Sequence, residues 1–550
     1  MSGTRDVDRT ETATGVARPP HQVGGRYAHY VLAVLILVYI FNFIDRNILS
    51  ILAEDIKSDL GISDAQMGFL YGTVFAIFYA VFGIPLARFA DVGTRRSLIA
   101  VGLSFWSVMT AASGLARSFG VLAACRIGVG IGEASASPAA YSMLSDYYPP
   151  KRRATAIAAY AGGVYIGAGI GIFLGGLILD TWSANYPNLA DAPFGLRGWQ
   201  VAFMLVGIPG ILLAVWVRTL REPIRGISEG LIAVKHPAPF RVLGSELMAI
   251  IPPLNLIGIR RDSRALAVNL GAVVACTIAA WVLIELTGSV AQWVASAFGI
   301  YVTFSWVQSL KTRDPVTFAL MFRSRAFIYT MLAFPMTAFV GYGAGFWIPP
   351  LLMRLHDVSA TEVGLYIGLG AALGGFTGIA LGGMLADYLK QKFPSGRLVV
   401  GYVVILGSAP VLLLLLYADS LVVVFWLNFV LTLFSASGGG VPPSIAADLV
   451  MPRMRAVAGA GYILVNTFIG LALGPYVMGK LSDTFHAGGM NEADALRTAI
   501  AVSLLTFIPA LVFLVLAQKH LPHDEATRLQ RALALGEPMG DAAATSTKSA

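Results

Sequence analysis

Stretches of about 20 apolar residues recur along almost the whole of this sequence, and they constrain its fold more than any other feature. An α-helix of about that length crosses the roughly 30 Å of hydrocarbon in a bilayer. We count about twelve such stretches and a further pair in the middle of the chain. Of the 550 residues, 56% are hydrophobic and 13% are charged, and the mean hydropathy is +0.71. This composition excludes a water-soluble globule and predicts an all-α, polytopic membrane protein.

The apolar stretches fall into two sets of six with a hairpin between them. In the first set we expect spans at residues 28–52, 64–89, 97–116, 119–147, 153–178 and 199–220. In the second set we expect spans at residues 326–352, 361–386, 397–417, 420–448, 455–479 and 496–518. Between the sets, residues 266–286 and 290–310 are both apolar and long enough to cross. They predict an extra transmembrane hairpin of structural role, whose even number of crossings leaves both sets with the same orientation.

The net charge of +8 does not gather into one basic patch, which argues against a nucleic-acid partner. Lysines and arginines instead concentrate in every second loop, so the positive-inside rule predicts that both termini are cytoplasmic. Residues 1–27 and 520–550 are polar and are expected to be disordered cytoplasmic tails. Residues 1–27 also lack the apolar core of a cleavable signal peptide, which together with the short loops favours a bacterial inner (plasma) membrane.

The two halves of the chain carry a repeated pattern. Four residues of the first half are matched 296 positions later, and four more are matched 302 positions later. The first group is Ser63, Gly68, Gly72 and Asp91, matched by Ser359, Gly364, Gly368 and Asp387; the second is Asp146, Pro150, Arg153 and Ala154, matched by Asp448, Pro452, Arg455 and Ala456. A parallel repeat of two six-helix bundles predicts the major facilitator fold, with substrate between the halves near the midplane. The expected bundles are 28–221 and 326–519, joined by a cytoplasmic segment 222–325 that carries the hairpin 266–310.

Four charged residues lie inside apolar spans: Asp45 and Arg46 in the first, and Arg126 and Glu133 in the fourth. A charge at bilayer depth costs about 2.5–3.5 kcal/mol on insertion scales, so these side chains should face a protein-lined cavity. Arg126 and Glu133 are two helical turns apart and share a face, and Asp45 should lie at the depth of Arg126 and contact it. We predict that Asp45 and Glu133 carry protons while both arginines alternate between these carboxylates and a substrate anion. The alternative is a permanent salt-bridge network that does not titrate.

The second half offers no titratable counterpart to this cluster. Asn428 stands where the fourth span has Arg126, and Ser435 stands where it has Glu133. The seventh and tenth spans instead bring aromatic residues: Phe334, Phe339, Tyr342, Phe346, Trp347, Phe425, Trp426, Phe429 and Phe434. One ionic wall and one aromatic wall suit an amphiphile with a charged head group, which Arg46, Arg126 and Asn428 would bind. Many of these aromatic residues would alternatively face lipid.

The loop after the second span, from Gly83 to Arg96, resembles the signature loop of major facilitators, although Ala87, Val92 and Thr94 depart from it. An acidic group near a helix end pairs with arginines or with the N-terminus of a neighbouring helix. We therefore predict a conformational latch at the cytoplasmic ends. Its expected members are Asp91, Arg95, Arg96, Asp146, Arg153 and Asp387. The alternative is that the arginines only fix the topology.

A stripe of glycines, Gly163, Gly167, Gly171 and Gly175, runs along the fifth span at four-residue spacing. Such a stripe leaves one helix face bare. It predicts the close approach of another helix.

ATP and a metal ion are not expected as cofactors. The segment Gly474–Lys480 is similar to the start of a nucleotide-binding loop, but Leu481 follows where a Ser or Thr is required, and no strand precedes it. The histidines fall in tails, loops or span ends. The spans therefore lack the metal cluster or the nucleophile and base that an integral-membrane enzyme would need, and we expect a transporter with no cofactor.

Three segments of the first half resemble the spinster family of major facilitator transporters. They are the run from Phe43 through Asp45 and Arg46 to Lys57, the run Arg126–Pro138 that contains Glu133, and the run Asp146–Arg153. The resemblance implies transport of sphingolipids or lysophospholipids, with proton coupling at Asp45 and Glu133. The expected partners are this substrate, protons and membrane lipids, and the expected state is a monomer.

Two other transport functions remain open. The organic-anion:proton symporters of sugar acids share the Asp-Arg and Gly-Glu-Ala elements, and drug export is a third possibility. A water-soluble anion would need more polar groups in the second half than Asn428 and Ser435 supply, which favours the lipid.

Overall fold

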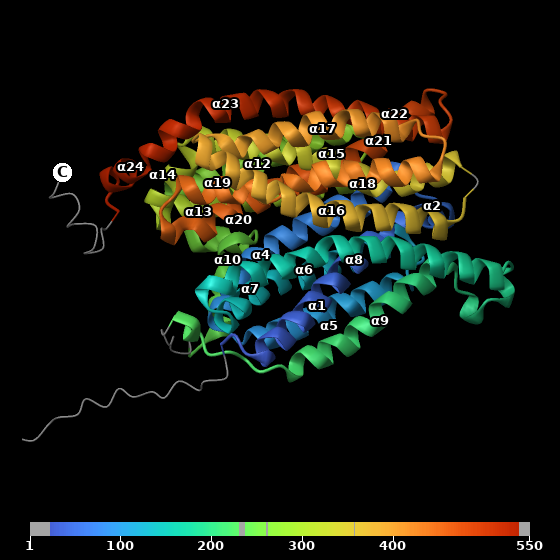
Figure 1. Cartoon of the computed structure of the whole chain (residues 1–550), viewed down its shortest axis with the longest axis horizontal. Coiled ribbons are helices and arrows are strands. Elements are labelled where there is room, and N and C mark those ends of the chain that lie inside the picture. Colours follow the sequence, from blue (N-terminus) through green and yellow to red (C-terminus); the bar gives the residue numbers. More distant parts are fainter. Residues whose placement is uncertain (1–22, 230–236, 260–261, 357, 538–550) are drawn as a thin grey trace, which may run out of the picture.

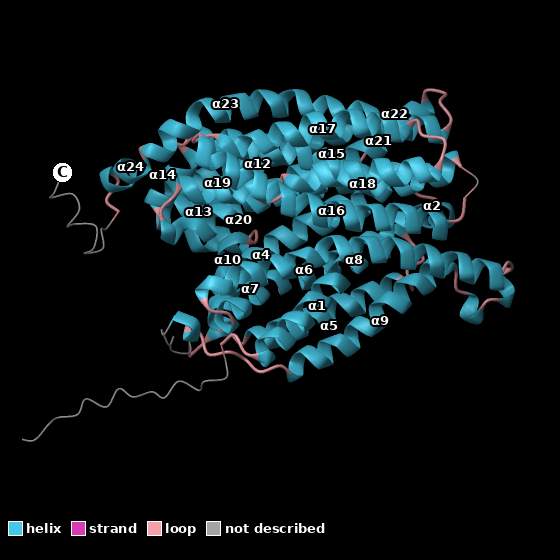
Figure 2. Cartoon of the chain, viewed as in Figure 1, coloured by secondary structure: helices cyan, strands magenta, loops and turns pink. Residues whose placement is uncertain are grey.

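The computed structural model describes residues 23–229, 237–259, 262–356 and 358–537. These residues form helices and connecting loops without a strand, as Figure 2 shows. Most of the expected N-terminal tail 1–27 and residues 538–550 of the expected C-terminal tail lie outside the described residues.

The first half contains six crossing elements and a few short helices. In order they are α1 (Arg26–Ile51), α2 (Ala53–Leu60), α3 (Asp64–Gly68) continued by the π-helix η1 (Phe69–Thr73) and α4 (Val74–Val92), α5 (Arg95–Ser113), α6 (Phe119–Glu133) continued by α7 (Ala136–Tyr147), α8 (Pro150–Asn185), the 3-10 turns η2 (Leu189–Asp191) and η3 (Pro193–Gly195), and α9 (Gly198–Thr219).

The second half repeats this plan. Its elements are α15 (Arg325–Leu355), α16 (Ala360–Lys392), η5 (Gly396–Leu398) continued by α17 (Val399–Leu416), α18 (Leu421–Ser437) followed by α19 (Val441–Leu449), η6 (Pro452–Met454) continued by α20 (Arg455–Asn466), the π-helix η7 (Thr467–Leu473) and α21 (Gly474–Ala487), α22 (Glu492–Ser503) continued by η8 (Leu504–Thr506) and α23 (Phe507–Ala526), and α24 (Arg528–Ala534).

The central segment contains two long helices and several short ones. They are η4 (Ile227–Glu229), α10 (Pro239–Ile250), α11 (Leu254–Ile259), α12 (Ser263–Thr287), α13 (Val290–Arg313) and α14 (Pro315–Phe322). Gly288 between the two long helices has a φ of 70°, a left-handed conformation that suits glycine in a tight connection. The helices α12 and α13 form the expected hairpin.

Thirteen helical elements of the described residues are long and apolar enough to cross a membrane. The less apolar α5 is not among them, but it lies alongside α9 in Figure 1 and completes the six crossings of the first half. The fold class predicted from the sequence is therefore confirmed: two six-helix bundles with an inserted hairpin in a multi-pass membrane protein.

The two bundles lie side by side with their helices roughly parallel. In Figure 1 the first half lies below and the second half above, and α8 and α16 meet at the boundary. The beginning of α1 and the short α24 lie at one end of the helices, which we call the terminal side. The helices α2 and α22 lie at the opposite end, which we call the far side.

The predicted glycine stripe of α8 packs against α1. A Cβ atom at Gly167 would lie 2.4 Å from the carbonyl oxygen of Ile40, and one at Gly171 would lie 2.9 Å from the corresponding atom of Ile44. Other glycines of α8 face the second half, where a Cβ at Gly169 would lie 2.3 Å from the carbonyl oxygen of Gly368 in α16. Glycine thus lets α8 approach two helices at backbone distance.

Residues 520–526 complete α23 and residues 528–534 form α24, whereas the sequence predicted a disordered end from residue 520. The helix α23 continues to Ala526 because Leu521 packs into the core. Asp524 also accepts hydrogen bonds from the Ser324 hydroxyl (2.7 Å) and the Ala326 amide (3.0 Å) at the start of α15. These contacts hold the C-terminal segment against the second half, and polar composition alone did not indicate them.

Candidate functional site

A cavity of about 470 Å³ lies between the two halves. Its lining comes from α1, η1, α8, α15, α16, α17, α18, α20 and α23, and several of these helices contribute residues near mid-length. The cavity therefore occupies the position where transporters of two parallel repeats bind substrate.

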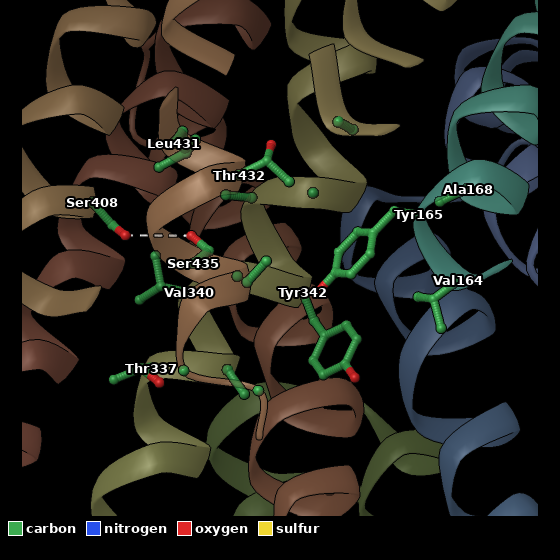
Figure 3. Close-up of a pocket in the computed structure, with 18 of the residues that line it drawn as sticks. Val164, Tyr165, Ala168, Thr337, Val340, Tyr342, Ser408, Leu431, Thr432 and Ser435 are labelled. Atoms are coloured by element: carbon green, nitrogen blue, oxygen red, sulfur yellow. Dashed lines mark hydrogen bonds between the residues drawn. The ribbon is translucent and has the colours of Figure 1, made fainter. Parts of the chain in front are cut away.

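The second half gives the cavity mostly neutral polar and aromatic groups. Its polar lining residues there are Thr337, Tyr342, Ser408, Asn428, Thr432, Ser435, Tyr462 and Asn466. The hydroxyls of Ser408 and Ser435 lie 3.3 Å apart, as Figure 3 shows. Tyr165 of α8 and Tyr342 of α15 lie next to each other at the boundary between the halves (Figure 3).

Arg46 is the charged residue among the lining residues. Its guanidinium donates a 2.7 Å hydrogen bond to Glu133 of α6, and the Glu133 side chain is fully buried. The same guanidinium lies 4.4 Å from the ring centroid of Phe75 and 4.6 Å from that of Phe43. Aromatic faces and one carboxylate therefore stabilise this cation in an apolar setting.

Arg126 lies deeper than Arg46 and is 1% exposed. It shares the ring of Phe75, 5.3 Å from the ring centroid, and donates to the carbonyl oxygens of Leu70 (3.3 Å) and Asp45 (3.5 Å). The expected contact between Asp45 and Arg126 is thus made by the backbone of Asp45. The Asp45 carboxylate lies beside Thr110 and Trp106 of α5. Among the described residues this carboxylate forms no ion pair with Arg126.

The structure divides the predicted site residues into two layers. Arg46 and Asn428 line the cavity, and the Asn428 amide donates to the carbonyl oxygen of Ile367 (3.0 Å). Asp45, Arg126 and Glu133 are each 1% exposed and are not lining residues. The buried layer therefore communicates with the cavity through Arg46.

The predicted aromatic wall is only partly present. Phe334 and Tyr342 line the cavity, and Phe346 stacks on Tyr71 of the first half with ring centroids 4.3 Å apart. Trp426 is 59% exposed and lies on the outer surface. Trp426 therefore fits the alternative that some of these aromatic residues face lipid.

A network of ion pairs joins the halves on the far side, and sequence reasoning missed it. Arg354, at the end of α15, binds Asp64 through hydrogen bonds of 2.7 and 2.9 Å, and it binds Glu54 through bonds of 2.8 and 3.1 Å. Asp483 accepts from the Asp64 amide (3.0 Å). Asp180 of α8 accepts from the Thr361 amide (2.6 Å). The available signal in the sequence was that charges such as Arg354 stand alone in the loops between the basic ones.

The predicted latch residues Arg95 and Asp146 lie within the first half, on the terminal side. Arg95 is 1% exposed, and its guanidinium forms ion pairs with Asp146 (2.5 Å) and Glu222 (2.8 Å). The Glu222 carboxylate also accepts a hydrogen bond from the Arg95 backbone amide. Asp146 accepts in addition from the Gly226 amide (2.8 Å). This cluster ties the segment after α9 to α5 and α7.

The other predicted latch residues also make contacts within their own half. Arg96 donates to the Leu220 carbonyl oxygen, and Arg153 donates to Ser228. Asp91 has Arg88 and Arg225 as neighbouring charges. In the second half Asp387 binds Arg397 (3.1 Å), which also binds Asp448.

The contacts between the halves are therefore unequal on the two sides of the membrane. Among the described residues before 230 and after 324, the side-chain hydrogen bonds between the halves lie from the middle of the bundles to the far side. They join α1, α2, α3, η1 and α8 to α15, α16, η7 and α21. The terminal-side clusters lie within one half each. The far side is thus closed in this structure, while the terminal side is not held shut by ion pairs between the halves.

No group of three or more His, Cys, Asp or Glu residues that could hold a metal ion occurs in the described ranges.

Two bundles around a central cavity, with buried ions on one wall, define a transporter rather than a pore or a soluble binding protein. The sequence model of the Major Facilitator Superfamily matches residues 35–475. The chain therefore belongs to the Major Facilitator Superfamily. Within it, the chain is a secondary transporter of the spinster type, as the following similarities show.

Three relatives illustrate the range of similarity. The chain is 29% identical over 466 residues to an MFS-type efflux pump of Mycolicibacterium smegmatis, with 84% of this chain and 86% of the relative aligned. It is 26% identical over 501 residues to human protein spinster homolog 1, covering 88% and 78% of the two chains. A shorter match, 28% over 193 residues, links it to a probable L-galactonate transporter of Escherichia coli, covering 34% and 39%.

A solved structure agrees in fold as well as sequence. The crystal structure of a bacterial homolog to the human lysosomal transporter spinster, in an inward-facing and unoccupied conformation, is 28% identical to this chain with a TM-score of 0.68. The match covers 91% of this chain and 98% of that one.

Proposed function

We propose that this protein is a proton-coupled secondary transporter of an amphiphilic anionic or zwitterionic lipid of the lysophospholipid or sphingolipid type. The observation that carries this proposal is Arg46, a cation that lines the cavity and is bonded to a buried carboxylate on its other side. The cavity around it is lined mainly by apolar and aromatic groups, with neutral polar groups from the second half. This arrangement suits one charged head group attached to an apolar chain.

The coupling follows from the position of Arg46 between the cavity and Glu133. A substrate anion that binds the guanidinium competes with the Glu133 carboxylate for the same donor. A carboxylate left without its cation in a buried site is costly, so taking up a proton neutralises it. Substrate binding and protonation of Glu133 thereby favour each other. Asp45, which is buried one residue away, is the second proposed proton carrier.

We further propose that the terminal side faces the cytoplasm of a bacterial cell and that the protein acts as a monomer in the inner membrane. The concentration of lysines and arginines in every second loop, which places them on one side of the membrane, supports this orientation. With this orientation the structure is inward-facing, because the halves are joined by ion pairs on the far side. The predicted latch residues Asp91, Arg95, Arg96, Asp146, Arg153 and Asp387 would then stiffen the cytoplasmic ends of each half.

Transport by purified protein in liposomes tests the function. Uptake of a radiolabelled lysophosphatidylethanolamine is measured with and without an acid gradient, with L-galactonate as the competing substrate class. We expect acid-stimulated uptake of the lysolipid, at least tenfold above empty liposomes, and none of the sugar acid. Glu133→Gln should abolish the stimulation. Glu285→Gln, an exposed carboxylate of the hairpin, should leave it unchanged and serves as the matched control.

Transport of a sugar acid is the second candidate, favoured by the partial similarity to the galactonate transporter. Acid-stimulated uptake of L-galactonate without lysolipid uptake would favour it over the lipid. Drug export, suggested by the name of the mycobacterial relative, predicts efflux of hydrophobic cations instead. Arg46 in the cavity lining opposes cationic substrates.

A further inference from the structure

Two π-helical turns of the described residues face each other where the halves meet. One is η1, within α3–η1–α4 of the first half, and the other is η7, within α20–η7–α21 of the second. The hydroxyl of Thr73 in η1 donates a 2.7 Å hydrogen bond to the carbonyl oxygen of Ala472 in η7. A Cβ atom at Gly72 would lie 2.4 Å from the carbonyl oxygen of Leu471. The two turns are therefore buried against each other at backbone distance.

A proline explains why η7 departs from the α-helix. Pro475, the second residue of α21, has no N–H group, so the carbonyl oxygen of Leu471 lacks the donor that it would have in an α-helix. In membrane helices, a local π-turn and the hydroxyls of neighbouring helices are two ways to accommodate such a proline. Both occur here, as η7 and as the bond from Thr73. Pro475 therefore weakens the α-helical form of η7 and brings it close in energy to the π-turn.

Beyond η7, one face of α21 packs closely against α3. A Cβ atom at Gly68 would lie 2.4 Å from the carbonyl oxygen of Pro475. A Cβ atom at Gly479 would lie 2.3 Å from the carbonyl oxygen of Asp64. Pro475 and Gly479 are four residues apart, so they lie on the same face of the helix. At these distances α21 cannot turn about its own axis while the halves stay together on the far side.

The same face of α21 continues into the polar network of the far side. The Ser482 hydroxyl donates a 2.7 Å hydrogen bond to the Asp64 carboxylate. The Asp483 carboxylate accepts from the backbone amides of Asp64 (3.0 Å) and Ala65 (2.9 Å) at the start of α3. Ser482 and Asp483 follow Gly479 by three and four residues, so they lie on the face that meets α3. The rotation of α21 about its axis thus decides whether these bonds can form.

We propose that η7 is a conformational switch that turns α21 when the far side opens. While the far side is closed, the Thr73 bond and the close contacts at Gly72 hold η7 as a π-turn. When the halves separate there, this support is lost and η7 adopts the α-helical form, which is the commoner one. A π-turn holds one residue more than the α-turn that replaces it, so the change rotates α21 by about 100°. Ser482 and Asp483 then face away from α3, and opening is a transition between two discrete states.

Distances within the second half test the switch, because a rigid rocking motion leaves them unchanged. A spin label at Thr484 on α21 is paired with one at Val422 of α18 or at Leu365 of α16, all exposed positions. The variant Arg354→Ala opens the far side, and a labelled pair across the halves reports the opening. We expect at least one distance within the second half to shift by about 5 Å or more, since side chains lie about 5–6 Å from a helix axis. A longer distance between the halves with unchanged distances within the second half would overturn the switch.

Replacing Pro475 by alanine tests the origin of the switch. The alanine N–H supplies the donor that Leu471 lacks, so the α-helical form of η7 should prevail even with Arg354 in place. We expect the label at position 484 to move as it does in Arg354→Ala. The matched control is Pro410→Ala, an exposed proline inside α17 of the same half, which should leave the distances unchanged. Unchanged distances in Pro475→Ala, or an equal shift in the control, would overturn the proposal. These distances do not depend on the substrate, so neither result bears on the proposed function.

Discussion

Arg354 and Asp64 lie 290 residues apart in sequence and form two parallel hydrogen bonds of 2.7 and 2.9 Å between the guanidinium and the carboxylate. One side chain ends α15 of the second half, and the other begins α3 of the first. Both side chains are nearly buried, at 6% and 5% exposed. This pair therefore favours the conformation in which the far side is closed.

Replacing Arg354 by alanine should open the far side. Removing one partner of a buried ion pair costs about 3–5 kcal/mol, here borne by the closed conformation alone. Spin labels at Leu189 and Met490, exposed far-side positions on the two halves, report the opening as a longer distance. Arg197→Ala removes the Arg197–Asp59 pair, which lies within the first half and whose arginine is 48% exposed, and should leave the distance distribution unchanged. An unchanged distribution in Arg354→Ala would contradict the assignment.

Gly169→Ala should disfavour the same closed conformation by a steric route. The new methyl group would lie 2.3 Å from the carbonyl oxygen of Gly368, so α8 and α16 must separate. We expect the far-side distance to lengthen and thermal stability to fall by about 1–3 kcal/mol, the usual cost of overpacking. Gly120→Ala in α6 is the control, because no atom lies within 4 Å of the added group. Equal behaviour of the two variants would refute the close-contact explanation.

Arg46→Lys should weaken binding of the anionic substrate while keeping the positive charge. Lysine lacks the planar guanidinium, whose several N–H groups can donate to Glu133 and to a ligand at the same time. Its ammonium group also interacts less well with the rings of Phe43 and Phe75. A loss of about 1.5–3 kcal/mol for a bond to a charged group corresponds to a roughly 10- to 150-fold higher Kd. Asn428→Ala removes a neutral group of the same cavity and should cost less, within about tenfold. Isothermal titration with a lysophospholipid measures both, and a larger loss for Asn428→Ala would move the head-group site to the second half.

Asp45→Asn and Glu133→Gln should differ in their effect on Arg46. Glu133→Gln removes the carboxylate that holds the guanidinium, so substrate affinity should lose its dependence on pH. In Asp45→Asn the Arg46–Glu133 pair remains, so binding should keep that dependence while proton-driven accumulation is lost. Counterflow, which needs no net proton movement, should persist in both variants. A pH-independent affinity in the unmodified protein would favour the permanent salt-bridge network.

The ion pair between Asp314 and Arg453 should stabilise the folded protein at neutral and mildly acidic pH, and this contribution should be lost at strongly acidic pH. Burial opposes the shift, but hydrogen bonds from Arg453 (2.6 Å) and Thr317 (2.7 Å) lower the pKa of Asp314 to about 2. An unfolded aspartate titrates near ~3.9, so the contribution of the pair is complete above about pH 4 and disappears as the pH falls toward 2. The difference in melting temperature between the unmodified protein and Asp314→Asn should follow this course in detergent. A difference that persists unchanged to pH 2 would refute it.

The sequence predicted the fold well because lengths and periods of apolar stretches determine it. The hairpin was expected at residues 266–286 and 290–310, and the helices run from Ser263 to Thr287 and from Val290 to Arg313. The glycine stripe of α8 predicted close packing, and its bare face indeed receives α1. Both inferences use only local sequence and the geometry of one helix.

The partners of the charged residues were harder to predict, because depth along a helix does not fix rotation about its axis. Successive residues point about 100° apart, since a turn contains 3.6 residues. Arg46 accordingly faces the cavity and Glu133, while the carboxylate of Asp45 faces α5. The pairing of Arg354 with Asp64 depends on how two separate bundles meet, which no local pattern encodes.

The bonds from Ser324 and Ala326 to Asp524 bear on how this protein is handled in the laboratory. A truncation before residue 524 would strip the first turn of α15 of the group that caps it. Glu537 forms an ion pair of 2.5 Å with Arg453, which is a second contact that holds the C-terminal segment. A purification tag fused before residue 537 would remove this contact. Tags and fluorescent fusions therefore belong beyond position 537.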